Sequence, residues 1–214
     1  VDEDGCCVAC GSTAIGDAWN LSLGGRLHRV EYGVTDLANP SQSDERTRNL
    51  TAYEIAVRYR ASAALSPYAR IGTSFRVPNV NDVYNLFTGV VSLLNPQTSH
   101  EQEIGVDIRY GPGTFRLALY HMTIDNELYF DPVAFTNRNL PPTRRQGVEA
   151  EGKWRFARSF DLFVNYTCAG SEFRSGDFGG VPIAGNEVPL VPRHAGPLQV
   201  IHDHGSESFD QVVM

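Results

Sequence analysis

Residues 103–120 read EIGVDIRYGPGTFRLALY, and this stretch decides the fold class. Apolar side chains take every second position in Ile104–Tyr110 and again in Phe115–Leu119, which is the period of a β-strand. The Gly111-Pro112-Gly113 motif between the two runs is typical of a tight turn. The stretch therefore predicts two long antiparallel strands joined by a short connection.

The same alternation recurs along the chain, and helix signals are almost absent. Most of these runs extend to about ten residues, the length that a tilted strand needs to cross a bilayer, whereas soluble strands average about five or six. The sequence thus predicts an all-β protein with about seven to eight strands. Their alternating cores are Trp19–Leu27, Tyr53–Tyr59, Ala69–Phe75, Ile104–Tyr110, Phe115–Leu119, Val148–Trp154 and Leu162–Tyr166.

The connections between these strands alternate between long and short. Outer-membrane barrels have long extracellular loops and short periplasmic turns. We therefore expect an antiparallel up-and-down transmembrane β-barrel whose first, third, fifth and seventh strands run outward. The long connections are 33–49, 76–98, 125–142 and 170–188, and the short ones are Leu65-Ser66-Pro67, Gly111-Pro112-Gly113 and Arg158-Ser159.

Periodicity alone does not say which way the apolar face points. In a soluble lipocalin-like barrel it would point inward. Here the opposite face carries many Arg, Glu, Asp and Lys residues, which suits a wide, wet lumen. Aromatic residues near strand ends fit interfacial girdles: Trp19, Tyr32, Tyr53, Tyr110, Trp154 and Tyr166.

Composition narrows the classes of function. The 214 residues have a net charge of −7, which disfavours a nucleic-acid partner. No run approaches the roughly 18 apolar residues of a transmembrane helix. Nucleophile elbows, Walker loops and HExxH motifs are absent, so we expect no enzyme activity. Cys7 and Cys10 cannot fill a zinc site alone, and His202-Asp203-His204 reads as a solvated tail, so we expect neither a metal site nor a cofactor.

Four motifs in order resemble the C-terminal barrel of TonB-dependent outer-membrane receptors between Trp19 and His194. Each is weak alone, but their order and hairpin spacing make the resemblance strong. They are Phe75-Arg76-Val77-Pro78, Leu94-Asn95-Pro96-Gln97-Thr98-Ser99 followed by Glu103 and Gly105, Asn137 and Asn139 before Gly147-Val148-Glu149, and Val188-Pro189-Leu190-Val191-Pro192-Arg193-His194.

The resemblance implies a receptor in the Gram-negative outer membrane that takes up an iron–siderophore complex, energised by the TonB–ExbB–ExbD system. Cobalamin is the next ligand, and haem is disfavoured because no histidine lies between Pro78 and Asn95. A soluble β-barrel binding module, a porin and an adhesin remain alternatives.

Ligand contacts in such a receptor are expected on the long loops and the upper lumen. Arginine suits an anionic ferric chelate through charge-assisted hydrogen bonds, although the same residues would equally pair with acidic neighbours. The candidates are Arg76, Asn79, Asn81, Asp82, Tyr84, Tyr129, Asn137, Arg138, Arg144 and Arg145.

The predicted organisation has three parts. Residues 1–15 form an off-pattern N-terminal end, 16–194 the partial barrel, and 195–214 an irregular tail that reads as truncated or frame-shifted. The plug domain, the TonB box and an export signal are expected to lie outside these residues. So few strands cannot close a barrel of the expected width, so we expect an open, curved sheet.

Overall fold

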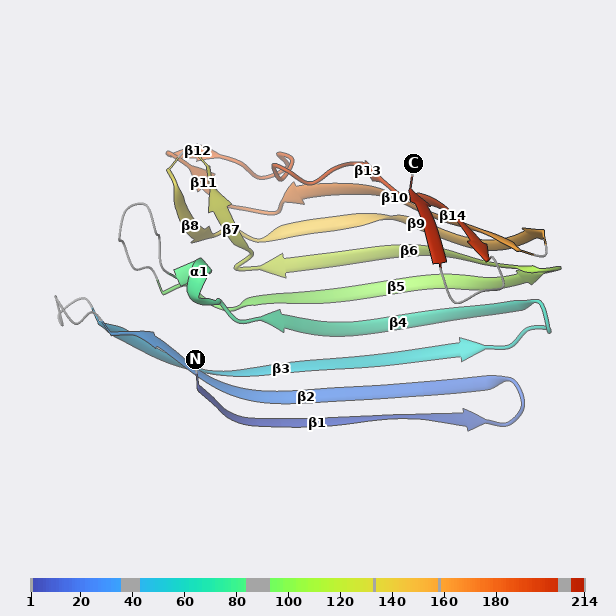
Figure 1. Cartoon of the computed structure of the whole chain (residues 1–214). Helices are drawn as coiled ribbons and strands as arrows, with labels where there is room; N and C mark the ends of the chain where they lie inside the picture. The colour runs from blue at the N-terminus through green and yellow to red at the C-terminus, as the bar shows by residue number, and fades with distance from the viewer. Residues whose placement is uncertain are drawn as a thin grey trace.

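A computed structural model describes residues 2–35, 43–83, 93–132, 134–157, 159–203 and 209–213. An eleven-stranded antiparallel sheet dominates it (Figure 1). Its path runs through β1 (Asp2–Ile15), β2 (Trp19–Val34), β3 (Asp44–Tyr59), β4 (Leu65–Arg76), β5 (Gln97–Tyr110), β6 (Gly113–Asp125), β9 (Thr143–Ala157), β10 (Phe160–Phe173), β14 (Leu198–Asp203) and β15 (Phe209–Val213). The eleventh strand, β13 (His194–Ala195), pairs with β10 beside this path.

Short turns gather at one end of the sheet and long connections at the other, as predicted (Figure 1). The β5–β6 turn is Gly111-Pro112, and Gly111 has φ 54°, which glycine adopts without strain. The long connections carry α1 (Val80–Val83), the hairpin of β7 (Leu128–Asp131) and β8 (Thr136–Asn139), and that of β11 (Asp177–Phe178) and β12 (Val181–Pro182). No helix in the described ranges is long and apolar enough to span a membrane.

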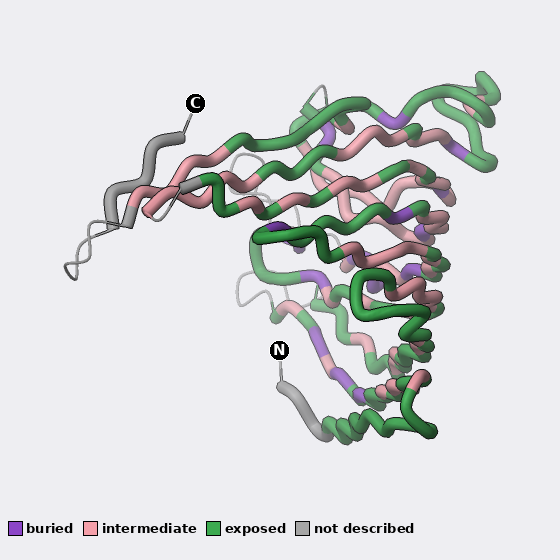
Figure 2. The backbone as a smooth tube through the Cα atoms, turned by 90° about the vertical axis from the view of Figure 1, so that its right-hand side faces the viewer, coloured by how far each residue is buried: buried purple, intermediate pink, exposed green. Residues whose placement is uncertain are grey.

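The sheet is curved and open. Within the described residues β1 and β15 are its two edges and do not pair with each other, and Figure 2 shows the wall bending along its length. The predicted open, curved sheet is therefore confirmed.

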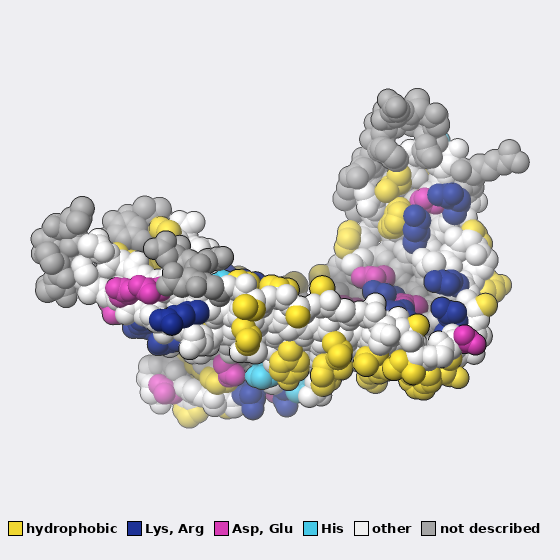
Figure 3. Space-filling model, turned by 90° about the horizontal axis from the view of Figure 1, so that it is seen from below, with side chains coloured by type: hydrophobic (Ala, Val, Ile, Leu, Met, Phe, Trp, Pro, Cys, Tyr) yellow, Lys and Arg dark blue, Asp and Glu magenta, His cyan; other side chains and the backbone are white. Residues whose placement is uncertain are grey.

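The two faces of the sheet differ in chemistry. Register places Ile104 beside Leu119 and Leu119 beside Val148, so these side chains share one face, and Ile104 is 59% exposed. Glu103 and Arg109 lie on the other face. Figure 3 shows the hydrophobic side chains along the convex edge and charged side chains within the concave side. An exposed apolar face this large is expected only where lipid covers it, so the concave face is the lumenal one.

Buried apolar residues gather at the long-loop end of the lumenal face. There, side chains of the strands meet residues of the long connections, and the Tyr32 hydroxyl donates to the Leu94 carbonyl over 2.9 Å. The packed part of the protein is therefore a loop layer folded onto the upper lumen. Its buried apolar members are Val30, Tyr32, Val83, Leu94, Ile124, Phe173 and Val188.

Both ends of the chain differ from the prediction. Residues set aside as an off-pattern end form β1, because the turn at Gly16 (φ 63°) returns the chain beside β2. The expected irregular tail forms β13, β14 and β15. The chain 186–203 covers the free side of β10, and Leu198 and Val200 pair with Val164 and Leu162 there.

One predicted turn is wrong. Leu65-Ser66-Pro67 lies inside β4, where Pro67 pairs with Val106, and the turn is formed by residues 60–64. The Ser62 hydroxyl accepts hydrogen bonds from the backbone N–H groups of Ala64 and Leu65, which closes that turn. Proline is tolerated because pairing of β4 with β3 reaches only to Tyr68.

The first long loop is shorter than predicted. Of residues 33–49, only 35–43 lie between β2 and β3, because register continues as far as the pair Val34 and Asp44. Similarly, β10 continues to Phe173, so the Gly-rich segment begins later than expected. The ends of these strands extend beyond the lipid, so neither of their faces needs apolar residues. Without alternation, such strand ends resemble loops in the sequence.

Glycines on the lumenal face receive tyrosine rings from neighbouring strands. Tyr68 pairs with Gly105 and Tyr120 with Gly147. A Cβ at Gly105 would lie 2.6 Å from the Tyr68 ring, and one at Gly147 would lie 2.4 Å from the carbonyl oxygen of Cys168. The glycines of two of the family-like motifs therefore make room for a ring or for close strand approach.

We expect Gly147→Ala to destabilise the folded chain in detergent micelles by about 1–3 kcal/mol, because its Cβ meets backbone that cannot move alone. Gly24→Ala on β2 is the matched control, since its Cβ meets nothing within 4 Å. The urea midpoint of unfolding measures both. Equal midpoints for the two variants would contradict the close packing at Gly147.

Candidate functional site

A charge network crosses the middle of the lumenal face, centred on Arg70. Its Nη2 lies 2.7 Å from Glu103 and 2.8 Å from Glu101, and its Nη1 lies 3.3 Å from Glu54. The Tyr68 hydroxyl donates to Glu103 over 2.7 Å. Glu103 thus pairs with Arg70, whereas no ion pair joins Glu149 to an arginine in the described residues.

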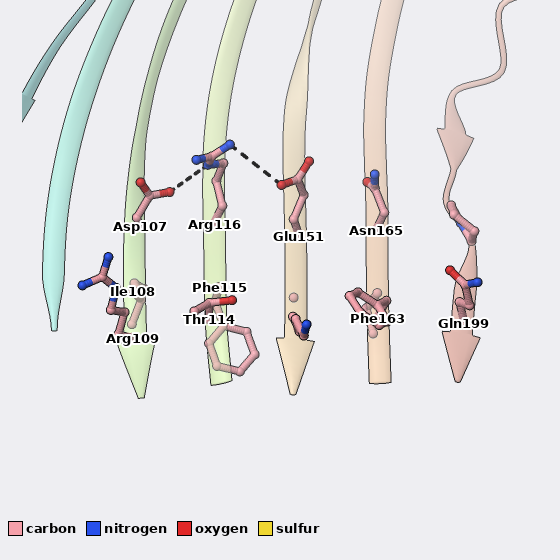
Figure 4. A pocket seen from close by; sticks show the side chains of 14 residues that line it. Asp107, Ile108, Arg109, Thr114, Phe115, Arg116, Glu151, Phe163, Asn165 and Gln199 are labelled. Atoms are coloured by element: carbon pink, nitrogen blue, oxygen red, sulfur yellow. Dashed lines mark hydrogen bonds and ion pairs between the residues drawn. The ribbon is translucent and has the colours of Figure 1, made fainter. Parts of the chain in front are cut away.

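A second network lies closer to the short turns. Asp107 pairs with Arg58 and, over 2.7 Å, with Arg116, which lies 3.9 Å from Glu151. Figure 4 shows this row along neighbouring strands. Alternating charges on adjacent strands neutralise one another, so the wall stays polar without carrying isolated charges.

The candidates near α1 form one compact loop. Arg76 pairs with Asp82 over 2.9 Å, and Asp82 also accepts a hydrogen bond from the backbone N–H of Asn79. The side-chain oxygen of Asn79 accepts from the backbone N–H groups of Asn81 and Asp82. These four residues therefore hold the turn after β4 in shape.

The β7–β8 hairpin is tied to this loop. The Asn137 side chain donates to the Asn81 carbonyl over 2.6 Å. Arg138 pairs with Asp131 over 2.8 Å, and its guanidinium lies 5.2 Å from the centre of the Phe178 ring. Contacts thus join three long connections, those that carry α1, β7–β8 and β11–β12.

Asn139 connects the same hairpin to the chain before β5. Its side-chain oxygen accepts from the Asn95 N–H over 2.8 Å, and its amide donates to the carbonyls of Asn95 and Asn126. An asparagine can satisfy all three groups at once because its side chain carries both an acceptor and donors. Asn139 belongs to a family-like motif, but it was not among the predicted site residues.

Each predicted arginine is already ion-paired. Arg76 and Arg138 pair as described above, Arg144 pairs with Glu172, and Arg145 pairs with Glu127. These ion pairs are the alternative that the sequence left open, in which the arginines pair with acidic neighbours, and ligand contact by the same residues stays a prediction. Acidic partners such as Glu127 and Asp131 were missed because they lie in the chain near other polar residues, with no spacing that links them to a given arginine.

The structure brings most, not all, of the predicted residues together. Arg145 pairs with Met122 and lies on the lumenal face. Arg144 pairs with Thr123, which pairs with His100, and these three side chains lie on the convex face. Tyr129 pairs with Arg138 in the β7–β8 hairpin. Tyr84 lies outside the described residues. The gathered candidates are Arg76, Asn79, Asn81, Asp82, Tyr129, Asn137, Arg138 and Arg145.

On the lumenal face three buried polar atoms lack partners in the described part of the chain. One is the Nε2 of His28 on β2, and the other two lie together beneath the loop layer. They are the Nε of Arg145 and the hydroxyl of Ser171, both buried. These residues are register partners on β9 and β10 and share the lumenal face. Buried donors are almost always hydrogen-bonded, so this position offers two donors to an incoming oxygen atom.

Metal-ligating side chains are dispersed. Within the described ranges no three His, Cys, Asp or Glu residues gather to hold an ion. Cys6, Cys7 and Cys10 lie exposed on β1 as free thiols. His204 of the predicted tail lies outside the described residues.

Residues 12–204 match the family model described as TonB dependent receptor-like, beta-barrel. The chain belongs to this family. Membership explains the antiparallel sheet, the apolar convex face and the long loops at one end, and it places the protein in the outer membrane of a Gram-negative bacterium.

Curated relatives of this family member include a ferrioxamine B receptor and a pesticin receptor. The ferrioxamine B receptor of Salmonella typhimurium is 26% identical over 155 residues, which cover 71% of this chain and 21% of that receptor. The pesticin receptor of Yersinia enterocolitica is 32% identical over 106 residues, which cover 49% of this chain and 15% of that receptor. The chain therefore spans about a fifth or less of the relatives it matches.

Solved structures share the fold at low identity. The ferric yersiniabactin uptake receptor of Yersinia pestis superimposes with a TM-score of 0.68 at 20% identity, covering 92% of this chain and 30% of that one. The ferric citrate transporter FecA gives 0.67 at 19% identity, with the same two coverages. These similarities establish the architecture, and the chain corresponds to about a third of such a barrel protein.

We expect Arg70→Gln to destabilise the folded chain by about 1–3 kcal/mol, because three glutamates lose their shared partner. Arg29→Gln is the matched control, since Arg29 is exposed on the convex face and has no ion-pair partner in the described residues. Urea unfolding in micelles measures both variants. A loss no larger than that of Arg29→Gln would show that the network contributes nothing to stability.

We expect Asn139→Ala to loosen the loop layer while leaving the sheet intact, because three hydrogen bonds to backbone groups disappear. Hydrogen exchange at the Leu140 amide, which bonds to the Glu127 carbonyl over 2.8 Å, should accelerate about tenfold or more. Amides in the middle of β5 should keep their protection, and Asn49→Ala on exposed β3 should change neither. Unchanged exchange at Leu140 would remove Asn139 from its proposed linking role.

Proposed function

We propose that this chain forms part of the barrel of an outer-membrane receptor that takes up a ferric siderophore complex, with energy supplied through the TonB–ExbB–ExbD system. The proposal assigns binding and transport to the protein and no enzymatic reaction. Its support is family membership together with relatives named as ferrioxamine B and ferric yersiniabactin receptors.

One observation carries the ligand assignment: Arg145 and Ser171 present two buried, unpartnered donors on the lumenal face beneath the loop layer. The oxygen-rich surface of a ferric chelate supplies acceptors for both. Arg76, Arg138 and Arg145 can exchange their ion pairs for bonds to the ligand, because Asp82, Asp131 and Glu127 each keep another hydrogen-bond donor, from the Asn79 N–H, the Ala134 N–H and the Thr143 hydroxyl.

Ser171→Ala tests this assignment in a way that separates binding from folding. The hydroxyl has no partner among the described residues, so its removal should leave the urea midpoint unchanged or raise it slightly. Affinity for the ferric complex should fall about fivefold, because one hydrogen bond contributes about 1 kcal/mol. Binding of iron-55 complexes of ferrioxamine B and citrate to the chain in micelles gives the measurement.

Two controls sharpen the result. Ser22→Ala removes a lumenal hydroxyl far from the loop layer and should change affinity for neither complex. Asp131→Asn releases Arg138 and should strengthen binding of the anionic citrate complex, whereas Arg138→Gln should weaken it. Binding of cobalamin without either ferric complex, or equal affinity of Ser171→Ala and the unaltered chain, would contradict the proposal.

A further inference from the structure

Three aromatic side chains at the short-turn end of the convex face form one flat surface. The ring centres of Tyr110 and Trp154 lie 6.2 Å apart with their planes at 27°, and those of Phe115 and Trp154 lie 6.0 Å apart at 38°. The rings come from β5, β6 and β9, and register places Tyr110, Gly113 and Trp154 side by side. We call these three rings the aromatic plate.

Glycines let the plate lie close against the sheet. A Cβ on Gly113 would overlap the six-membered ring of Trp154, and a Cβ on Gly152 would lie 3.2 Å from the Phe115 ring. A Cβ at a convex position points away from the sheet, so each ring lies across the backbone of a glycine on the neighbouring strand. Gly113 is buried beneath its ring. One face of each ring therefore packs on backbone, and the opposite face is turned outward.

The plate carries two polar groups without partners. Neither the Tyr110 hydroxyl nor the Trp154 indole N–H makes a hydrogen bond within the described residues, and Tyr110 is 71% exposed. Tyrosine and tryptophan, each with an apolar body and a polar tip, are typical of the boundary between lipid and water. Because the short turns of an outer-membrane barrel lie on the periplasmic side, the plate faces the headgroups of the periplasmic leaflet.

The described residues of the convex wall around the plate are uncharged. Arg109 and Lys153 are neighbours of plate residues in the chain, but they alternate with them and lie on the lumenal face. An anionic headgroup would therefore find no cation on this part of the wall. The convex positions on the adjoining strands are Leu65, Val106, Ile108, Leu117, Leu162 and Val164.

A positive group suits this surface. The π-system of an aromatic ring is negative over its faces, and a cation within about 6 Å of the ring centre is attracted to it, most strongly by tryptophan. Because both Tyr110 and Phe115 border Trp154, a cation over the outward face of Trp154 has two further rings beside it. The plate therefore favours a lipid whose headgroup ends in a cation.

We propose that the aromatic plate binds the ammonium group of a phospholipid headgroup, with phosphatidylethanolamine of the periplasmic leaflet as the occupant. The ammonium group would lie over the outward face of Trp154, and the Tyr110 hydroxyl would donate a hydrogen bond to the phosphate of the same headgroup. The acyl chains would continue along the apolar wall past Ile108 and Leu117. This selectivity for a headgroup goes beyond the general contact of the convex face with lipid tails.

Trp19 is the other tryptophan of the chain and provides a comparison within the same molecule. It lies at the short-turn end of β2, but its ring centre is only 4.6 Å from that of Tyr59. Rings this close overlap in part face to face, whereas the rings of the plate lie side by side. Trp19 therefore meets the same interface with less open ring face.

Native mass spectrometry of the full chain refolded in maltoside micelles measures lipid binding, and this detergent carries no ammonium group of its own. Phosphatidylethanolamine should bind about fivefold more tightly than phosphatidylglycerol with the same acyl chains. Trp154→Leu should abolish this preference, and Trp154→Phe, which keeps a ring face but lacks the N–H, should retain part of it. Trp19→Leu is the matched control and should leave the preference unchanged.

Three results would overturn the proposal. The first is equal binding of the two lipids, or tighter binding of phosphatidylglycerol. The second is an equal loss of preference in Trp154→Leu and Trp19→Leu, because the preference would then belong to interfacial tryptophans in general. The third is a loss in Trp154→Phe as complete as in Trp154→Leu, which would assign the selectivity to the indole N–H and not to the ring face.

Nuclear magnetic resonance gives a second readout on the unaltered chain. With nitrogen-15 in the tryptophan side chains, the two indole N–H groups give two signals, which Trp19→Leu assigns. Titration with lysophosphatidylethanolamine should shift the Trp154 signal more than the Trp19 signal, and lysophosphatidylglycerol should produce no such difference. Equal shifts of both signals with the ammonium lipid would exclude a headgroup site at the plate.

Discussion

The ladder of backbone hydrogen bonds that runs from β1 to β15 is the constraint on which the other features depend. Lipid offers no partner for an N–H or C=O group, so a chain that crosses it by strands must pair each strand with its neighbours. Once the strands are paired, successive side chains point to opposite faces of the sheet. Ile104 must meet lipid and Glu103 must meet the lumen, and the position of every later charge follows from register.

This constraint explains why the described residues form a wall without a central apolar core. The convex face packs against lipid, and the lumenal face is held by ion pairs such as Arg70 with Glu103 instead of apolar contacts. Apolar burial returns only where the long loops fold onto the upper strands, around residues such as Tyr32 and Phe173. The shape of the loop layer thus depends on apolar side-chain packing, and the unpartnered atoms of Arg145 and Ser171 lie beneath it.

The lumenal wall has different electrostatics at its two ends. Near the loops, arginines such as Arg138, Arg144 and Arg145 are paired with acidic residues on neighbouring segments. Near the short turns, Arg60 and Arg109 have no acidic partners in the described residues, and cationic side chains outnumber acidic ones on this part of the wall. The two ends of the lumenal wall therefore differ in how their arginines are paired.

The alternation of apolar and polar residues in the sequence determined most strands and which side chains share a face, because side-chain direction in a strand has a fixed period of two. The spacing of those strands along the chain determined the order of long and short connections. The alternation did not predict β1 and β14, whose residues are small or mixed in polarity. These segments are strands because they pair with the free edges of β2 and β10. The alternation also failed at Pro67, whose tolerance depends on where pairing with β3 stops. Ion-pair partners such as Glu127 for Arg145, the linking role of Asn139 and the packing of Trp154 over Gly113 were decided only by tertiary structure. They join residues distant in the chain, and the register that brings them together is set by the whole sheet and not by any local segment.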